Sequence, residues 1–176
     1  MIRKLPEALR AAFDSNVDEF LTDPTAIMLS AAKSAIGVTV KDQATINLFR
    51  STVGGANGES WCMSFVQSCI AYAEERTGAR SPLMATELCM GLWDLSKDRR
   101  VKNPLPGDII IWQFGQTIHG HTGFIVGSNS ISWRTVEGNT SGATTIDANG
   151  NGVWSKIRAK GGSKTFIEVG FLRVFG

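Results

Sequence analysis

The sequence has little net charge. Its 176 residues include 18 Lys and Arg against 16 Asp and Glu, which leaves a formal charge of +2 at pH 7. A nucleic-acid-binding domain usually carries a clear basic excess, so we expect no nucleic-acid partner. The mild positive balance remains compatible with an anionic polymer as substrate.

Long apolar runs are also missing. The most apolar stretches, 26–40 and 109–112, are interrupted by polar residues or are too short, whereas a membrane span needs roughly 18 to 20 apolar residues. Segment 1–20 contains neither the apolar core nor the cleavage site of a secretory signal. We therefore expect a chain that is synthesised in the cytoplasm without a signal peptide and does not insert into a membrane. Any action outside the cell would need a separate route of release.

Cysteine is scarce, with three residues at positions 62, 69 and 89. An odd number at these spacings does not form the disulfide framework of a small secreted domain, so we expect reduced thiols. Internal repeats and low-complexity linkers are absent from the sequence. Its length and 43% apolar content fit one domain over 1–176, which we expect to be monomeric. We place its helical part at about 1–100 and its sheet at about 105–176.

The first half of the chain is patterned as helices. Apolar positions recur at intervals of three and four over the segments 6–20, 22–36, 62–76 and 83–95. Asp23 and Pro24 supply a cap and a favoured first-turn proline for the second helix, and Gly37 ends it. Gly78 ends the third helix. Segment 53–60 is rich in Gly, Asn and Ser and is expected to be irregular.

The second half is patterned as strands. Short β-branched or aromatic runs separated by Gly, Asn and Ser occupy 108–114, 121–127, 131–138, 152–158 and 165–174. The stretch 138–152 is the one long segment expected to be flexible. Because parallel strands need a crossover helix between them, helices followed by strands predict an α+β fold with an antiparallel sheet.

Cys62 is the first candidate for chemistry. It lies at the predicted start of a helix, where unpaired N–H groups and the helix dipole stabilise a thiolate, the reactive form of cysteine. Cys69 lies two turns inside the same helix, and Cys89 falls between Leu88 and Met90. These two cysteines are interpreted as small buried apolar residues.

His121 and Glu137 are the next candidates. If the strands 121–127 and 131–138 form a hairpin about Asn129, His121 lies directly opposite Glu137, close enough for the carboxylate to fix the imidazole tautomer. Asn139 would share that face. A thiol hydrolase needs this arrangement, in which an oriented base serves the sulfur. A slip of one residue would move Glu137 to the other face.

These residues resemble the CHAP domain, a family of cysteine- and histidine-dependent amidohydrolases and peptidases with a papain-like α+β fold. The resemblance covers about 60–139 and rests on four blocks in family order. The blocks are Trp61-Cys62-x-x-Phe65-Val66, Pro106-Gly107-Asp108-Ile109, Gly120-His121-x-Gly123-x-Ile125-Val126 and Val136-Glu137-Gly138-Asn139. The resemblance implies that Cys62 is the nucleophile, His121 the base, Glu137 the orienting acid and Asn139 an auxiliary polar group.

Many members of the family hydrolyse peptidoglycan, and the chain also looks like small single-domain lysins of phages and prophages. The resemblance therefore implies a bacterial peptidoglycan hydrolase that acts as an N-acetylmuramoyl-L-alanine amidase or as an endopeptidase. A holin or a secretion system would release it to the wall. Some members carry an Asp-rich calcium loop before the nucleophile, whereas 53–60 offers only Glu59. We expect no metal and no other cofactor.

Several alternatives remain open. Trp61, beside the nucleophile, and His119, in a glycine-bounded loop, are expected to contact the substrate, although core packing and solvation are the simpler interpretations. His119 and His121 could bind zinc with a cysteine, but the paired short spacings of a structural zinc site are missing. Lys156 and Arg158 alternate on one strand face that could meet an anionic substrate, but we interpret it as a solvated face. The chain could also be a cysteine peptidase or deamidase that acts on proteins, or a non-catalytic wall-binding module.

Overall fold

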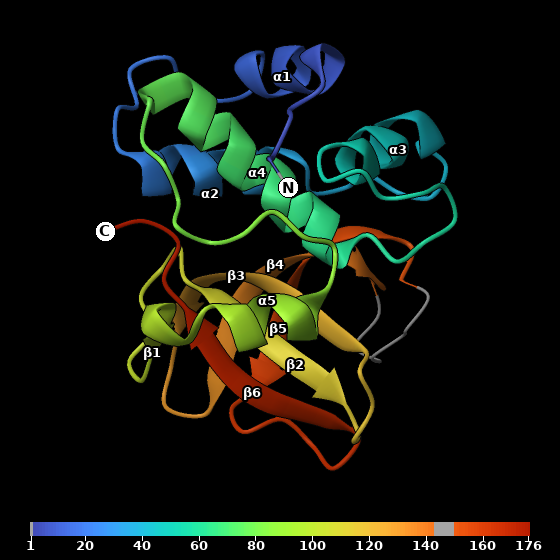
Figure 1. Cartoon of the computed structure of the whole chain (residues 1–176), viewed down its shortest axis with the longest axis vertical. Coiled ribbons are helices and arrows are strands. Elements are labelled where there is room, and N and C mark those ends of the chain that lie inside the picture. Colours follow the sequence, from blue (N-terminus) through green and yellow to red (C-terminus); the bar gives the residue numbers. More distant parts are fainter. Residues whose placement is uncertain (1, 143–149) are drawn as a thin grey trace.

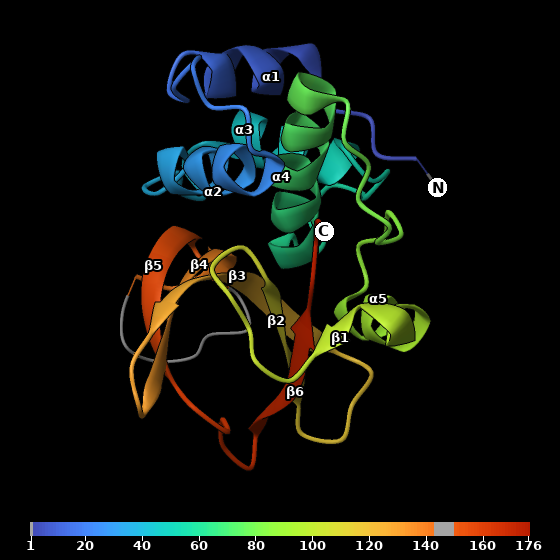
Figure 2. The same cartoon turned by 90° about the vertical axis from the view of Figure 1, so that its left-hand side faces the viewer.

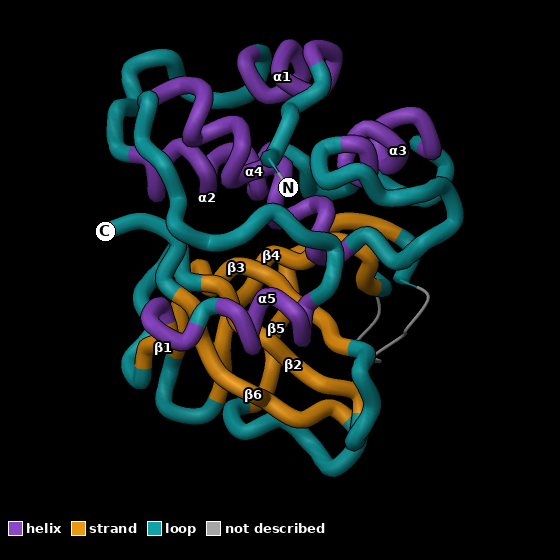
Figure 3. Tube along the Cα trace, in the orientation of Figure 1, coloured by secondary structure: helices purple, strands orange, loops and turns teal. Residues whose placement is uncertain are grey.

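The computed structural model describes residues 2–142 and 150–176 and has two layers, helices above and a sheet below (Figure 1). The helices come first along the chain and the strands follow, as the sequence colours of Figure 1 show. Figure 3 marks the same helices in purple and the strands in orange. The helices are α1 (Glu7–Asp14), α2 (Pro24–Ser34), α3 (Gln43–Ser51), α4 (Cys62–Thr77) and α5 (Cys89–Leu95), with a short 3-10 turn, η1 (Lys97–Arg99).

The strands form one sheet in the order β1-β6-β2-β3-β4-β5, and every neighbouring pair runs antiparallel. The predicted α+β class with an antiparallel sheet is confirmed. The strands are β1 (Arg100–Val101), β2 (Ile109–Phe114), β3 (Gly120–Ser128), β4 (Ser132–Thr140), β5 (Gly152–Ala159) and β6 (Phe166–Leu172).

Helix α4 joins the two layers. Every residue from Cys62 to Glu74 is buried, because α2 and α3 pack against one side of the helix and β3 and β4 against the other. Gly78 ends the helix with a left-handed φ of 74°, which glycine adopts without a steric cost. Figure 2 shows α1 to α4 together on one side of the sheet, with α5 beside β1 at its flank. The first residue of α4 is thus held firmly above the sheet.

Apolar side chains cover both faces of the sheet. One face joins the large core under the helices, and the other carries a second apolar cluster, made of Ile110, Trp112, Ile125, Trp133, Phe166 and Phe171. Because side chains alternate along a strand, Trp112 and its cross-strand partner His121 lie on the second face. His121 therefore projects toward the cluster and away from the main core.

The structure corrects several predicted boundaries. Helix α1 ends at Asp14 and does not reach residue 20, and only Cys89–Leu95 of the predicted helix 83–95 is helical. Helix α3 and strand β1 were not predicted, because each is short and the apolar stripe of α3 is interrupted by the buried Arg50. Part of the stretch 138–152, residues 143–149, lies outside the described residues. Among the helices that the structure describes, none is long and apolar enough to cross a membrane.

Candidate active site

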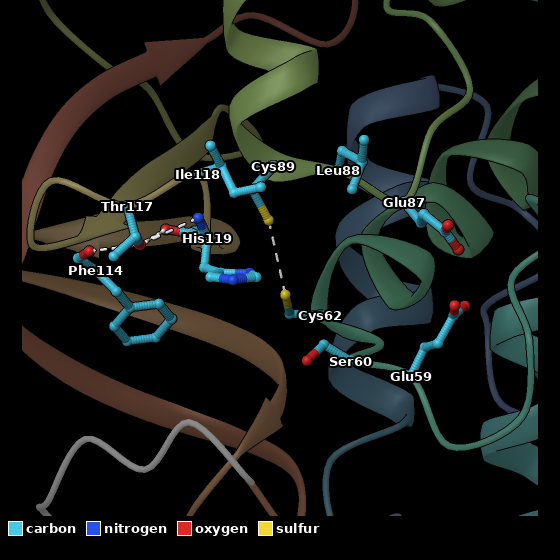
Figure 4. A pocket seen from close by; sticks show the side chains of 11 residues that line it. Glu59, Ser60, Cys62, Glu87, Leu88, Cys89, Phe114, Thr117, Ile118 and His119 are labelled. Carbon is cyan, nitrogen blue, oxygen red and sulfur yellow. Dashed lines mark hydrogen bonds between the residues drawn. The ribbon is translucent and has the colours of Figure 1, made fainter.

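Cys62 lies at the edge of a cavity of about 500 Å³ between α5, the start of α4 and the β2–β3 loop. The thiol-bearing residue is only 4% exposed, so the cavity is its route to solvent. Figure 4 shows Cys62 and Cys89 with their sulfur atoms turned toward each other, between His119 and Leu88. The lining residues are Glu59, Ser60, Cys62, Glu87, Leu88, Cys89, Phe114, Thr117, Ile118, His119 and Gly120.

The imidazole of His121 meets the carboxylate of Glu137. His121 Nε2 lies 2.9 Å from Glu137 Oε2, and both side chains are buried. Because Nε2 contacts the carboxylate, Nδ1 is the ring nitrogen left for the sulfur of Cys62, with which His121 also interacts. The ring of His121 stacks on Trp112 with centroids 5.8 Å apart, which fixes its plane. Helix α4 and strands β3 and β4 thus bring together a thiol, an imidazole and a carboxylate.

The register of this hairpin differs from the predicted one. Phe124 pairs with Val136, and a bulge lies between Ile125 and Gly127. Continued from Phe124, this register places Glu137 opposite Gly123. Glu137 is therefore displaced by two residues from the position opposite His121. The prediction that His121 and Glu137 face each other directly is therefore wrong. Their side chains still meet because a displacement of two residues keeps both on one face.

Gly123 makes that diagonal contact possible. A Cβ atom added at Gly123 would lie 2.5 Å from Cγ of Glu137 and 2.8 Å from the carbonyl oxygen of Val136. Such distances are well inside van der Waals contact, so a side chain at position 123 would displace the carboxylate. The missing side chain leaves the space through which Glu137 reaches the imidazole.

The pKa values of Cys62 and His121 are shifted in opposite directions. The pKa of Cys62 lies well below that of an ordinary thiol, because hydrogen bonds from Cys89 and His121 and the charge of His121 outweigh burial. Burial lowers the pKa of His121, but the hydrogen bonds and charges of Cys62 and Glu137 outweigh it and raise the pKa to about 9. The arrangement therefore favours a thiolate beside an imidazolium, the reactive state of a cysteine nucleophile.

Glu137 is ionised although it is fully buried. Burial raises its pKa, yet the hydrogen bonds and charges of Arg158 and His121 outweigh that effect and lower the pKa to about 2. Thr135 donates a further hydrogen bond to Oε1. The prediction that Lys156 and Arg158 form a solvated strand face is wrong, since both are buried and Arg158 pairs with Glu137.

Cys89 was missed as a site residue. It is buried, as predicted, but its Sγ lies 3.7 Å from Sγ of Cys62. Its hydrogen bond with Cys62, together with burial, raises the pKa of Cys89 well above the ordinary value. No sequence pattern indicates this contact, because 27 residues separate the two cysteines and their approach depends on where α5 packs.

The other predicted site residues lie around this centre. His119 is exposed and lines the same cavity as Cys62. Trp61 is 2% exposed, stacks on Phe49 with centroids 5.9 Å apart, and lines a neighbouring cavity of about 190 Å³ together with Asn139. Asn139 is buried at the end of β4 with a left-handed φ of 52°. A substrate contact by Trp61 or His119 and an auxiliary role for Asn139 stay predictions.

The alternative that His119 and His121 bind zinc has no supporting ligand set in the part of the chain that the structure describes. Within it, no group of three or more His, Cys, Asp and Glu side chains is arranged to hold a metal ion. His119 is exposed in a loop, whereas His121 is buried against Glu137. The chemistry that these side chains support is nucleophilic attack by a thiolate with a neighbouring proton donor.

Comparison with known proteins gives one match. Residues 54–139 match the model of the CHAP domain, and this region includes Cys62, His121, Glu137 and Asn139. No curated protein and no solved structure matches the chain.

Proposed function

Because residues 54–139 belong to the CHAP domain family, whose members are amidases and peptidases of peptidoglycan-like substrates, we propose that the chain hydrolyses an amide bond in bacterial peptidoglycan. The bond is either the muramoyl-alanine amide or a peptide bond of the stem or cross-bridge. We further propose that residues 1–176 act as one catalytic unit, which a holin or a secretion system releases to the wall.

In the proposed reaction, the thiolate of Cys62 attacks the amide carbonyl carbon and forms a tetrahedral intermediate. The backbone N–H of Cys62, at the start of α4, donates a hydrogen bond to the developing oxyanion. The imidazolium of His121 then protonates the leaving amine, the C–N bond breaks and a thioester remains. Water, deprotonated by His121, hydrolyses the thioester and regenerates the thiol. The sum is one amide and one water converted to an acid and an amine.

The proposal rests on one observation. The cavity-lining thiol of Cys62 interacts with the imidazole of His121, which in turn contacts the buried carboxylate of Glu137, and the three side chains come from three different elements. Glu137 holds Nε2 of His121 and thereby keeps Nδ1 directed at the sulfur. The cavity itself combines apolar walls at Leu88 and Ile118 with carboxylates at Glu59 and Glu87. This combination suits an extended peptide that carries a free amine.

Digestion of purified sacculi tests the proposal. The protein should release soluble fragments, and mass spectrometry of their new termini should identify the bond. Cys62→Ala should release none, whereas Cys69→Ala, which removes a buried thiol two turns further along α4, should keep activity. Iodoacetamide should inhibit and a chelator should not. If the enzyme left sacculi intact but cleaved protein substrates, it would instead be a peptidase or deamidase that acts on proteins.

A further inference from the structure

We infer that Arg158 is a positioning residue, which holds the carboxylate of Glu137 ionised and fixed so that Glu137 can orient His121. Arg158 lies on β5, outside the region that matches the family model. The role rests on the thiol chemistry of the proposed function, because Arg158 contacts no reacting atom and positions Glu137, which in turn orients His121.

The guanidinium of Arg158 donates a hydrogen bond to each oxygen of the Glu137 carboxylate. Its Nε donates to Oε1 of Glu137 at 2.8 Å and its Nη2 donates to Oε2, the oxygen that also contacts His121. Nη2 donates in addition to Oγ1 of Thr140 at 3.1 Å. A two-point arginine–carboxylate contact fixes both the position and the plane of the carboxylate. His121 therefore meets an acceptor whose orientation is already set.

Two aromatic rings lie beside the guanidinium of Arg158. Its Cζ lies 5.6 Å from the ring centroid of Trp112 and 5.3 Å from that of Phe166. Trp112 also stacks on His121, so the same ring supports both groups that contact Glu137. Arg158 is 6% exposed, which leaves it little freedom to move to solvent. Lysine cannot reproduce this planar, two-donor contact, although it can supply the charge.

The charges around Glu137 explain why a cation is needed. His121 faces it from β3, and Arg158 and Lys156 approach it from β5, while Cys62 lies beyond His121 on α4. Without Arg158, burial would raise the pKa of Glu137 toward the range in which the enzyme works. A protonated Glu137 would no longer stabilise the imidazolium. Removal of a positive charge would also raise the pKa of the Cys62 thiol, so both changes act against the reactive ion pair at low pH.

Arg158→Met tests this role, with Arg158→Lys as the conservative variant. In Arg158→Met we expect the acid limb of the kcat/KM–pH profile to move up by about one pH unit or more and kcat at pH 7 to fall about tenfold to a hundredfold, with a smaller change in KM. Arg158→Lys should recover most of the shift in the acid limb, because the charge remains, but only part of kcat.

Arg173→Met is the matched control. Arg173 makes a similar two-point contact with Asp108, with both distances 2.8 Å, and it lies away from the cavity of Cys62. Its loss should leave the acid limb unchanged. The pH dependence of Cys62 alkylation by iodoacetamide, located by mass spectrometry, gives a readout that needs no substrate. If alkylation shifts in Arg158→Met while sacculi stay intact even with the wild type, the proposed peptidoglycan substrate is wrong and the positioning of Glu137 by Arg158 stands.

A double variant keeps the test decisive. In a Glu137→Gln background, Arg158→Met should move the acid limb clearly less than it does in the wild type, because only the direct effect of its charge on Cys62 remains. If Arg158→Met does not fold, Arg158→Lys in both backgrounds supplies the same comparison through kcat. The inference is overturned if a folded Arg158→Met protein keeps the wild-type acid limb and kcat. It is also overturned if Arg158→Lys changes kcat by the same factor in the wild-type and Glu137→Gln backgrounds.

Discussion

The sulfur atoms of Cys62 and Cys89 lie 3.7 Å apart, and the pKa of the first thiol is lowered while that of the second is raised. Cys89 therefore acts as a hydrogen-bond donor to the thiolate of Cys62. We expect Cys89→Ala to raise the pKa of Cys62, because the donor is lost. The measurement is the rate of Cys62 alkylation as a function of pH, whose midpoint should move up.

Cys69→Ala is the control for that variant, since Cys69 is also buried but lies two turns along α4 from Cys62. It should leave the alkylation midpoint of Cys62 in place. If Cys89→Ala and Cys69→Ala gave the same midpoint as the wild type, the thiolate would not depend on a neighbouring thiol.

The same pair of thiols predicts a response to hydrogen peroxide. The thiolate of Cys62 attacks one peroxide oxygen and becomes a sulfenic acid with loss of water; the thiol of Cys89 then attacks that sulfur and releases a second water. We expect inactivation with the loss of two hydrogen atoms per chain, and recovery in dithiothreitol. Peptide mapping should find a Cys62–Cys89 disulfide.

In Cys89→Ala the sulfenic acid has no partner and should proceed to the sulfinic acid, which dithiothreitol does not reduce. Inactivation of this variant should therefore be irreversible. Full recovery of peroxide-treated Cys89→Ala in dithiothreitol would contradict the pairing.

The sequence predicted the site residues whose placement depends on local structure. Cys62 begins a helix because the apolar period starts there, and His121 and Glu137 meet because a displacement of two residues along a strand preserves the face. Cys89 and Arg158 could not be found in this way. Their contacts span 27 and 21 residues. They depend on how α5 packs and on how far the long Arg158 side chain reaches from its ladder partner Trp133 toward Glu137.

The shifts at Cys62 and His121 predict a bell-shaped pH profile for kcat/KM. The thiolate–imidazolium pair exists above the lowered pKa of Cys62 and below the pKa of His121, about 9. Activity should therefore hold through neutral pH and fall as His121 loses its proton near pH 9. Steady-state rates across buffers of constant ionic strength measure this. An alkaline limb near the ordinary pKa of histidine would show that Glu137 and Cys62 do not stabilise the imidazolium.

Gly123→Ala tests the space through which Glu137 reaches His121. The new Cβ would lie 2.5 Å from Cγ of Glu137, so the carboxylate must shift. We expect unfolding free energy to fall by about 1–3 kcal/mol and kcat/KM to fall about a hundredfold. Urea unfolding and steady-state rates measure the two effects.

Gly37→Ala separates loss of stability from loss of geometry. Gly37 has a φ of 97° with no atom within 4 Å of an added Cβ, so alanine there strains the backbone but touches nothing at the site. It should lower the unfolding free energy by about 1–2 kcal/mol while kcat/KM stays near the wild type. If Gly123→Ala kept wild-type kcat/KM as well, the diagonal contact between Glu137 and His121 would not be what orients the base. Loss of activity confined to Gly123→Ala would tie the rate to that contact, because both variants lose stability but only at position 123 does the added methyl group meet Glu137.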